Sequence, residues 1–385
     1  MISRRTLLAS AAGLPGLSFA ALPAAGERRF VFVVLRGGMD GLSAAPVPGD
    51  PAFADARGPL ANLGAPALPL QGPFALHPLL PGLHAMYGRG ELAVVHATGL
   101  PYKERSHFDA QNVLESGGTR PYELPTGWIG RALAAAGAPR AVALETAVPL
   151  VLRGAGTVDT WAPSALPDPS ADLVARLQAM YANDAPLAQA LERARGLRSE
   201  PGMPADGMAG GARGRGAVVE LARRAADFLQ RGTQVAVLEL GGWDSHANQA
   251  APQGALSNNL RTLDATLAAL REGLQPNGAW AKTVVLVATE FGREVAINGT
   301  QGTDHGSGGV AFVLGGAVAG GRVLADWPGL AKKDRFEGRD LRITTDLRAV
   351  QRTILSDHLG IARAALDASV LPGSAALPTL DLLRA

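Results

Sequence analysis

A chain of 385 residues is long enough for one large α/β domain or for two ordinary domains. Its 36 Lys and Arg residues nearly balance its 34 Asp and Glu residues, which argues against nucleic acid or an anionic membrane surface as a partner. The chain contains no cysteine, so disulfides, thiolate zinc sites, iron–sulfur clusters and cysteine nucleophiles are excluded.

The first 25 residues have the pattern of an export signal. Arg4 and Arg5 precede an apolar stretch over residues 7–22, and small residues follow it. Such a segment is typical of a signal peptide, and the paired arginines favour the twin-arginine route. We therefore expect a twin-arginine signal peptide at 1–25, the twin-arginine export machinery as a partner, and a periplasmic or secreted protein. An ordinary Sec signal and a retained anchor are the alternatives. No later segment has the roughly 20 uninterrupted apolar residues of a membrane helix.

The rest of the chain alternates short apolar runs with helical patterns, which is typical of an α/β fold with a mostly parallel central sheet and helices on both faces. We expect strands at Phe30–Leu35, Leu92–His96, Ala141–Leu144, Gln234–Leu240, Thr283–Ala288 and Val310–Leu314. We expect helices at Leu79–Tyr87, Phe108–Glu115, Gly127–Ala136, Ala171–Arg195, Ala217–Arg231, Leu256–Leu274 and Asp346–Leu359.

Residues 28–385 are expected to form a single domain. The glycine-rich stretch at 196–216 has few bulky apolar residues and predicts a flexible surface loop. The stretch at 145–170 contains Pro163, Pro167 and Pro169 and is interpreted as an insertion.

Polar residues gather where the predicted strands end, which is where open α/β sheets place their sites. After the first strand, two glycines allow a sharp turn before Asp40, which is either a metal ligand or a helix N-cap. Further along, Ser106 and His107 open a helix whose first turn favours an anion. Ser106 is therefore a candidate nucleophile, with a simple cap as the alternative.

Three more clusters follow in the second half of the chain. Asp244 and His246 leave a strand end together and form a plausible metal pair, whereas a cap of the next helix would be the structural alternative for His246. Glu290 and Arg293 reach the same edge, and they could simply pair with each other.

The last cluster is Asp304-His305, which lies among five glycines and has little packing to do. A role in function is therefore favoured over a role in structure.

Several motifs resemble those of a bacterial family, the domain of unknown function numbered 1501. They are, in order, RGGMDGL, RSHFDAQ, GGWDSH, TEFGR, NGTQGTDHGSGG and GGAVAGGRVLADWPGL, and the resemblance covers about residues 28–360. That family is similar to the alkaline-phosphatase superfamily, which includes sulfatases and cofactor-independent phosphoglycerate mutases. The resemblance implies an alkaline-phosphatase-like fold and an exported metal-dependent hydrolase of phosphate or sulfate esters, small-molecule or polymeric.

The resemblance also implies roles for individual residues. It makes Asp40 and Glu290 ligands of a first metal ion, and Asp244, His246 and His305 ligands of a second. Ser106 takes the place of the nucleophile. The spacing Asp-x-His replaces the usual Asp-x-x-x-His, and Phe291 stands where the superfamily has an imidazole. His107 or Asp304 could substitute for that imidazole.

These roles define an expected mechanism. A divalent cation would activate the Ser106 hydroxyl, Arg293 would spread the negative charge of the transition state, and His246 or His107 would protonate the leaving oxygen. One or two ions are expected. The imidazole-containing set suits zinc, whereas the oxygen-only set of Asp40, Glu290 and Ser106 suits magnesium, calcium or manganese. A catalytically inactive exported binding or assembly protein is the alternative function.

Overall fold

The computed structural model describes residues 27–137, 139–154, 156–163, 169–198 and 215–384. The expected signal peptide lies outside these residues, and so does most of the expected loop at 196–216. Helix α8 runs on to Arg198 and helix α9 begins at Arg215, so the described ends of that loop are helical. Among the described residues, no helix has both the length and the apolar character needed to cross a membrane.

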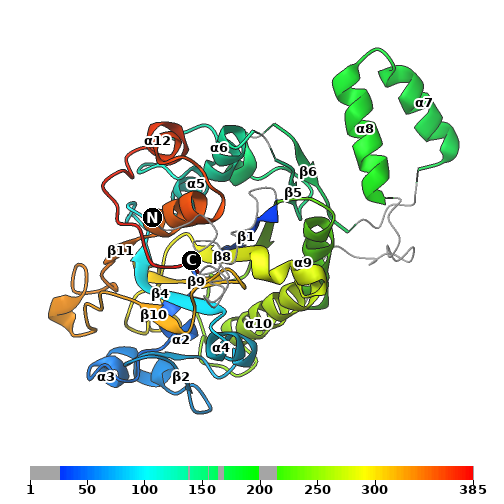
Figure 1. Ribbon diagram of the computed structural model, residues 1–385. Helices are drawn as coiled ribbons and strands as arrows, with labels where there is room; N and C mark the ends of the chain where they lie inside the picture. The colour runs from blue at the N-terminus through cyan, green and yellow to red at the C-terminus, as the bar shows by residue number, and fades with distance from the viewer. Residues whose placement is uncertain (1–26, 138, 155, 164–168, 199–214, 385) are drawn as a thin grey trace, which may run out of the picture.

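A nine-stranded sheet forms the centre of the described part of the chain, in the order β10-β4-β9-β8-β1-β7-β5-β6, with β11 paired to β4 (Figure 1). Its strands are β1 (Arg29–Leu35), β4 (Leu92–Gly99), β5 (Ala141–Ala143), β6 (Val158–Thr160), β7 (Val235–Leu240), β8 (Thr283–Thr289), β9 (Gly309–Leu314), β10 (Arg322–Leu324) and β11 (Thr345–Asp346). All six predicted strands form. Residues 145–170 are not merely an insertion, because β6 within them pairs with β5 at the edge of the sheet. A separate hairpin joins β2 (Leu68–Pro69) and β3 (Ala75–Leu76).

Strand β9 runs against the direction of its neighbours. It is antiparallel to both β4 and β8, whereas β1 is parallel to β7 and β8. Residues 290–308 between β8 and β9 contain no crossover helix, so the chain turns back at the carboxyl edge of β8. This loop therefore lies at the edge where β1, β7 and β8 end, although it precedes a strand.

Helices cover both faces of the sheet (Figure 1). They are α2 (Gly41–Ala44), α3 (Phe53–Arg57), α4 (Pro81–Gly88), α5 (His107–Ser116), α6 (Trp128–Ala135), α7 (Ala171–Tyr181), α8 (Ala185–Arg198), α9 (Arg215–Gln230), α10 (Ala255–Leu274), α11 (Leu347–Thr353) and α12 (Arg363–Ala365).

Alternate residues of β1 supply two hydrophobic cores, as expected for a strand that is buried on both faces. Val31 and Val33 face a core that includes residues of α4, α9 and α10. Phe30 and Phe32 face a second core that includes residues of α5, α6 and α11. The sheet is therefore enclosed, and only its edges are open for a site.

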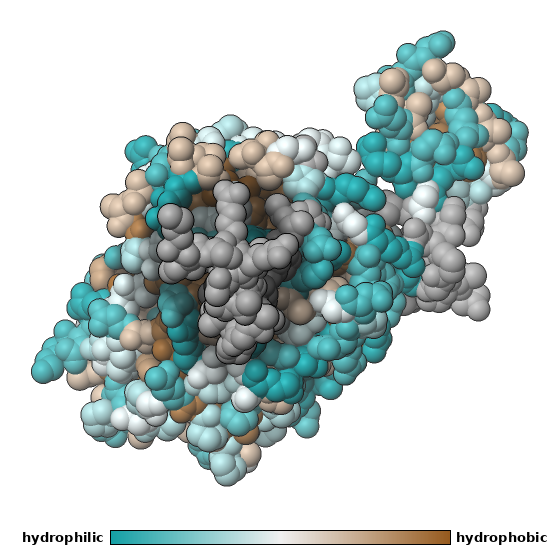
Figure 2. Space-filling model, in the orientation of Figure 1, coloured by the Kyte–Doolittle hydropathy of each residue, from teal (hydrophilic) through white to brown (hydrophobic). Residues whose placement is uncertain are grey.

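Helices α7 and α8 form an arm that projects from the body of the protein (Figure 1). The sequence predicted one helix here, but the chain turns after α7. The physical reason is that Asp184 caps α8, its Oδ1 accepting from the backbone N–H of Leu187 at 3.1 Å, and that Pro186 occupies the first turn. Figure 2 shows hydrophilic and hydrophobic residues mixed on the arm, where Met180 is 72% exposed.

Candidate metal centre

Side chains from separate segments converge at the carboxyl edge of the sheet. They come from the start of α5, the loop after β7, the end of β8 and the loop before β9. One ligand atom each from His107, Asp244 and His305 forms a group in which all three atoms lie within 4.8 Å of one another. His246 adjoins this group, with its Nε2 2.9 Å from Asp244 Oδ1 and 3.0 Å from His305 Nε2. The structure thus brings together four of the residues that the sequence singled out.

Two glycines after β1 allow these loops to approach closely. Gly37 and Gly38 have φ values of +118° and +68°, which favour glycine. A Cβ on Gly37 would lie 2.5 Å from the backbone nitrogen of Asp244, and a Cβ on Gly38 would lie 2.5 Å from the ring of Phe291. Any larger residue would therefore push the loops after β7 and β8 away from β1.

The outer ring nitrogens decide how the three imidazoles are protonated. Nδ1 of His107 lies 2.9 Å from the Glu290 carboxylate, and Nδ1 of His305 lies 3.0 Å from the carbonyl of Arg105. Nδ1 of His246 lies 3.2 Å from the Asp304 carboxylate. Because these oxygens can only accept, each of them can hold the Nδ1–H of its ring, and Nε2 is then the atom left to bind a cation. The Nε2 atoms of His246 and His305 also lie 2.9 and 3.2 Å from Asp244 Oδ1.

The positions of the three Nε2 atoms fit a metal ion. Nε2 of His305 lies 3.0 Å from Nε2 of His107 and 3.0 Å from Nε2 of His246. Two nitrogens on a tetrahedral zinc ion would be about 3.3 Å apart, given Zn–N bonds of about 2.0–2.1 Å. A carboxylate or carbonyl on the far nitrogen is also the usual partner of a histidine that binds a metal. The donor set of imidazoles and one carboxylate therefore fits a zinc-like cation.

Glu290 contacts Nδ1 of His107, the ring nitrogen that points away from the other candidate ligands. Its buried carboxylate accepts from Gly37 N at 2.8 Å, from Gln111 Nε2 at 3.0 Å and from His107 Nδ1. Burial opposes ionisation, but these hydrogen bonds outweigh it and lower the pKa of Glu290 to about 2. The same hydrogen bond raises the pKa of His107. Glu290 pairs with His107 and not with Arg293, which was the alternative from the sequence.

The protonation states of Asp244 and His305 also suit the binding of a cation. Burial works against ionisation of Asp244, yet the hydrogen bond and charge of Arg293 lower the pKa of this carboxyl group. Burial lowers the pKa of His305 and favours the neutral ring that a metal requires.

Phe291 does not leave a gap where the superfamily has an imidazole. Its ring packs 4.7 Å from the ring of His107 and 4.9 Å from that of His305, measured between centroids. His107 of α5 lies against the Phe291 ring, and its role as the substitute ligand stays a prediction.

Arg293 connects the loops that carry the candidate ligands. The side chain is 1% exposed, and its guanidinium donates to the carbonyls of Gly37, Gly38 and Thr303 at 2.9, 2.7 and 3.0 Å and to the carboxylate of Asp244. Since all three of its nitrogens have acceptors, these contacts favour a positioning role over the expected contact with a substrate. The catalytic role of Arg293 stays a prediction.

Asp40 is an N-cap and one half of a buried ion pair. It accepts from the backbone N–H groups of Leu42 and Ser43 at 3.1 and 3.2 Å, and it pairs with the buried guanidinium of Arg57. It also accepts from Gln249, whose Oε1 accepts from the Thr303 hydroxyl at 2.7 Å. Asp40 lies outside the group of ligand atoms, so the contacts favour the capping alternative, and its role as a metal ligand stays a prediction.

Ser106 is the N-cap residue of α5, and its side chain makes no cap hydrogen bond. Its hydroxyl lies within hydrogen-bonding reach of the Tyr102 hydroxyl. The preceding residue, Arg105, has a φ of 60°, and its side chain is held by Glu337 and Asp340 rather than directed at the centre. Ser106 is therefore adjacent to His107 in the chain without a described contact to the metal-binding group.

Substitutions of Asp40 and His305 distinguish a carboxylate that stabilises the fold from a residue that binds the metal. Asp40→Asn leaves the guanidinium of Arg57 buried without a counter-charge, so the free energy of unfolding is expected to fall by roughly 3–5 kcal/mol. The folded protein should still retain tightly bound metal. His305→Ala should instead remove the metal and leave the stability of the metal-free protein almost unchanged.

Urea unfolding of metal-free protein, together with the metal content of folded protein by mass spectrometry, measures both effects. His84→Ala is the control, because His84 lies outside the centre and contacts Pro69. Loss of metal in Asp40→Asn at unchanged stability would show that Asp40 is a ligand.

A third substitution tests the pair formed by Glu290 and His107. The Glu290 carboxylate favours the charged imidazole, so Glu290→Gln is expected to lower the pKa of His107, and His107 would lose its proton at a lower pH than in the wild type. NMR titration of the imidazole signals in chelator-treated protein measures the change. Asp304→Asn, which alters the carboxylate beside His246, should leave the pKa of His107 nearly unchanged. An unshifted His107 in Glu290→Gln would contradict the assigned hydrogen bond.

Comparison with known proteins gives a family and several distant structures. The family model described as "Protein of unknown function (DUF1501)" matches residues 96–361. A search among curated proteins found no match.

The solved structures are similar only at low sequence identity. A protein in the alkaline phosphatase superfamily from Vibrio parahaemolyticus is 14% identical, with a TM-score of 0.42, and the match covers 94% of this chain and 76% of that one. A phosphonate monoester hydrolase from Silicibacter pomeroyi is 10% identical, with a TM-score of 0.45 and coverages of 92% and 76%. A sulfatase from Pseudoalteromonas sp. is 13% identical, with a TM-score of 0.42 and coverages of 88% and 69%.

Proposed function

The chain belongs to this DUF1501 family, and we propose that it is an exported, metal-dependent hydrolase of phosphate or sulfate esters with a serine nucleophile. The observation that carries the proposal is the convergence of His107, Asp244 and His305, with His246 beside them. Each imidazole has an oxygen acceptor at Nδ1, and Nε2 of His305 lies 3.0 Å from Nε2 of both His107 and His246.

A single ion is proposed, held by His107, Asp244 and His305. When bound, a cation such as zinc would polarise a phosphoryl or sulfuryl oxygen and favour a deprotonated hydroxyl beside it. The expected second, oxygen-only site is not part of the proposal. The carboxylate of Asp40 is committed to Arg57, and that of Glu290 is committed to His107.

Ser106 is proposed as the nucleophile. Because its hydroxyl is not used as a helix cap, rotation about χ1 can turn it away from Tyr102. The first turn of the ten-residue helix α5 presents free backbone N–H groups, which favour an anionic ester close to Ser106.

His246 and Asp304 are proposed to move the proton. His246, whose Nε2 lies 2.9 Å from Asp244 Oδ1 and 3.4 Å from Arg293 Nη1, would take the proton of the Ser106 hydroxyl as the serine oxygen bonds to phosphorus or sulfur, and would then donate this proton to the leaving oxygen as its bond to phosphorus or sulfur breaks. Asp304 keeps the ring oriented through Nδ1. A water molecule would then hydrolyse the covalent ester on Ser106, with His246 taking a proton from the water and returning it to the serine oxygen as the ester bond breaks.

A metal-binding protein without turnover is the second candidate function. The observation that favours it is the contact of the Ser106 hydroxyl with Tyr102 instead of the centre.

Assays of p-nitrophenyl phosphate and p-nitrophenyl sulfate hydrolysis distinguish the two functions. The wild type, loaded in turn with zinc, manganese, magnesium and calcium, should hydrolyse at least one ester. Ser106→Ala should keep the metal and lose at least roughly a thousandfold in kcat/KM, whereas His305→Ala should lose both metal and turnover. His84→Ala should match the wild type. Bound metal in a wild type that hydrolyses neither ester would favour the second candidate.

Export is part of the proposal and rests on Arg4 and Arg5 before the apolar segment at 7–22. Replacing both residues by lysine should keep the protein in the cytoplasm while a Sec-dependent reporter is still exported. Cell fractionation measures the distribution, and normal export of the double variant would contradict the twin-arginine route.

A further inference from the structure

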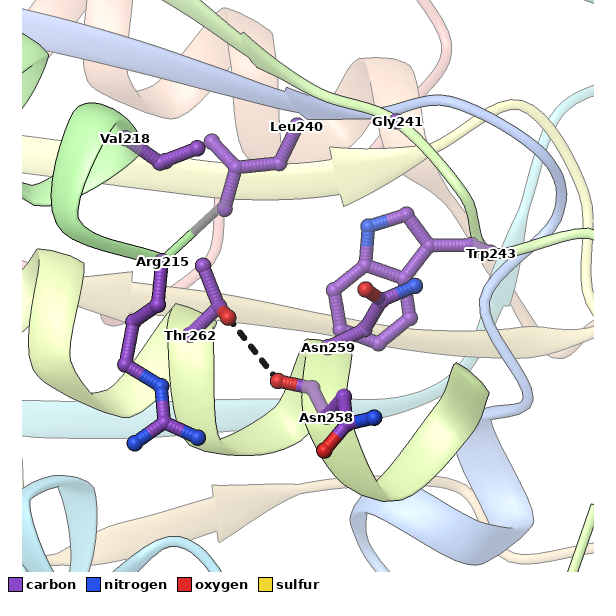
Figure 3. A pocket seen from close by; sticks show the side chains of 8 residues that line it. All are labelled: Arg215, Val218, Leu240, Gly241, Trp243, Asn258, Asn259 and Thr262. Carbon is purple, nitrogen blue, oxygen red and sulfur yellow. Dashed lines mark hydrogen bonds between the residues drawn. The ribbon is translucent and has the colours of Figure 1, made fainter. Parts of the chain in front are cut away.

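A cavity of about 610 Å³ lies beside the candidate centre, at the carboxyl end of β7 (Figure 3). This volume is in the usual range for small-molecule sites, about 300–1,000 Å³. The first turns of α9 and α10 form two of its walls, and the end of β7 and the following loop form another. The residues that matter for its chemistry are Arg215, Leu240, Trp243, Asn258 and Asn259.

The electrostatic character of this cavity favours an anion. Arg215 supplies a positive charge, and none of the described lining residues is acidic. Arg215 is the first residue of the 16-residue helix α9, and Asn258 and Asn259 lie in the first turns of the 20-residue helix α10. The positive ends of two helix dipoles therefore add to the charge of Arg215.

The indole of Trp243 provides the second observation that points to a ligand. Trp243 is 1% exposed, and its Nε1–H is buried without a hydrogen-bond partner. Buried polar groups nearly always have a partner, so this unpaired donor in a cavity wall is free to donate to an acceptor on a ligand. In Figure 3 the nitrogen-bearing edge of the indole faces the side of the pocket on which Leu240 lies.

The indole is held in place by its backbone neighbours. Asn259 Nδ2 donates to the carbonyl of Gly242 at 2.6 Å, and Arg293 donates to the carbonyl of Trp243 at 3.1 Å. The next residue, Asp244, belongs to the candidate centre. Leu240 and Asp244 are four residues apart, which sets an upper limit of about 14 Å on the distance between their Cα atoms.

We propose that this cavity is a second binding site, which takes an oxyanion group, that is, a carboxylate, phosphate or sulfate group. Arg215 provides its counter-charge, and Trp243 Nε1–H donates a hydrogen bond to one of its oxygens. On the proposed function, an ester substrate with a second anionic group would place that group here while its ester lies at the metal centre. Binding of the anion by itself does not depend on that function.

NMR titration with inorganic phosphate tests the site. The chain has five tryptophans, so the indole region of a ¹H–¹⁵N spectrum is small, and Trp243→Phe assigns the signal of Trp243. Phosphate is expected to move the Trp243 Nε1–H signal downfield in the wild type. Arg215→Gln should weaken binding roughly tenfold, the usual order for the loss of a charged hydrogen bond.

Three controls make the result decisive. Arg223→Gln, an exposed residue of α9 that pairs with Glu220 at 3.4 Å, should bind phosphate as the wild type does. His305→Ala should also keep the response, because the centre is not needed. The proposal would be overturned if the signal did not move, if sodium chloride moved it equally, if Arg215→Gln responded as the wild type does, or if His305→Ala abolished the response.

A second experiment tests whether the cavity binds a free anion or an anionic group of the substrate. Phenyl phosphate and 4-carboxyphenyl phosphate differ in one carboxylate. In the metal-loaded enzyme, Arg215→Gln should raise KM for the carboxylated ester roughly tenfold and leave KM for phenyl phosphate unchanged. Equal effects on both esters, with NMR binding intact, would overturn the substrate part and leave a site for free anions. Failure of all hydrolysis would concern the proposed function and leave the NMR result standing.

Discussion

One buried guanidinium joins the loops on which the candidate centre depends. Arg293 follows β8, and it donates to carbonyls of the loop after β1 and to Thr303 before β9. It also pairs with Asp244 after β7. Removing a charge from water costs several kcal/mol unless hydrogen bonds compensate, and here backbone carbonyls and one carboxylate do so. Arg293 has all of its hydrogen-bond acceptors only when the loops after β1 and β7 and the loop before β9 lie next to one another.

A second network of buried polar side chains hydrogen-bonds the same loops to one another. Asp40, paired with Arg57, accepts from Gln249, and Gln249 accepts in turn from Thr303. The segment that carries Asp244 and the segment that carries His305 are thereby tied to the start of α2. The carboxylates at this edge have different surroundings: Asp40 and Glu290 are buried and hydrogen-bond other residues, whereas the Asp244 side chain is 43% exposed.

The centre and the anion-favouring cavity share one short loop, residues 241–246. Asp244 and His246 face the imidazoles of His107 and His305, while Trp243 lines the cavity. On the proposed function, a cation site next to a site for an anion would suit an ester that has more than one charged group. Specificity would then come from the spacing of the two proposed sites, because the ligand side chains by themselves would not distinguish one phosphate or sulfate ester from another.

Apolar runs in the sequence determined the six main strands, because a strand buried on both faces must be apolar throughout, and Gly-flanked polar clusters marked the edge of the sheet. The motifs also named every residue of the centre. Only the tertiary structure decided which of them meet. It placed His305 at this edge because β9 runs antiparallel, and it packed His107 of α5 against Phe291. It also gave Asp40 and Arg293 partners that lie far away in the chain. A carboxylate looks the same in a sequence whether a cation or a guanidinium will face it, since that choice depends on contacts between distant segments.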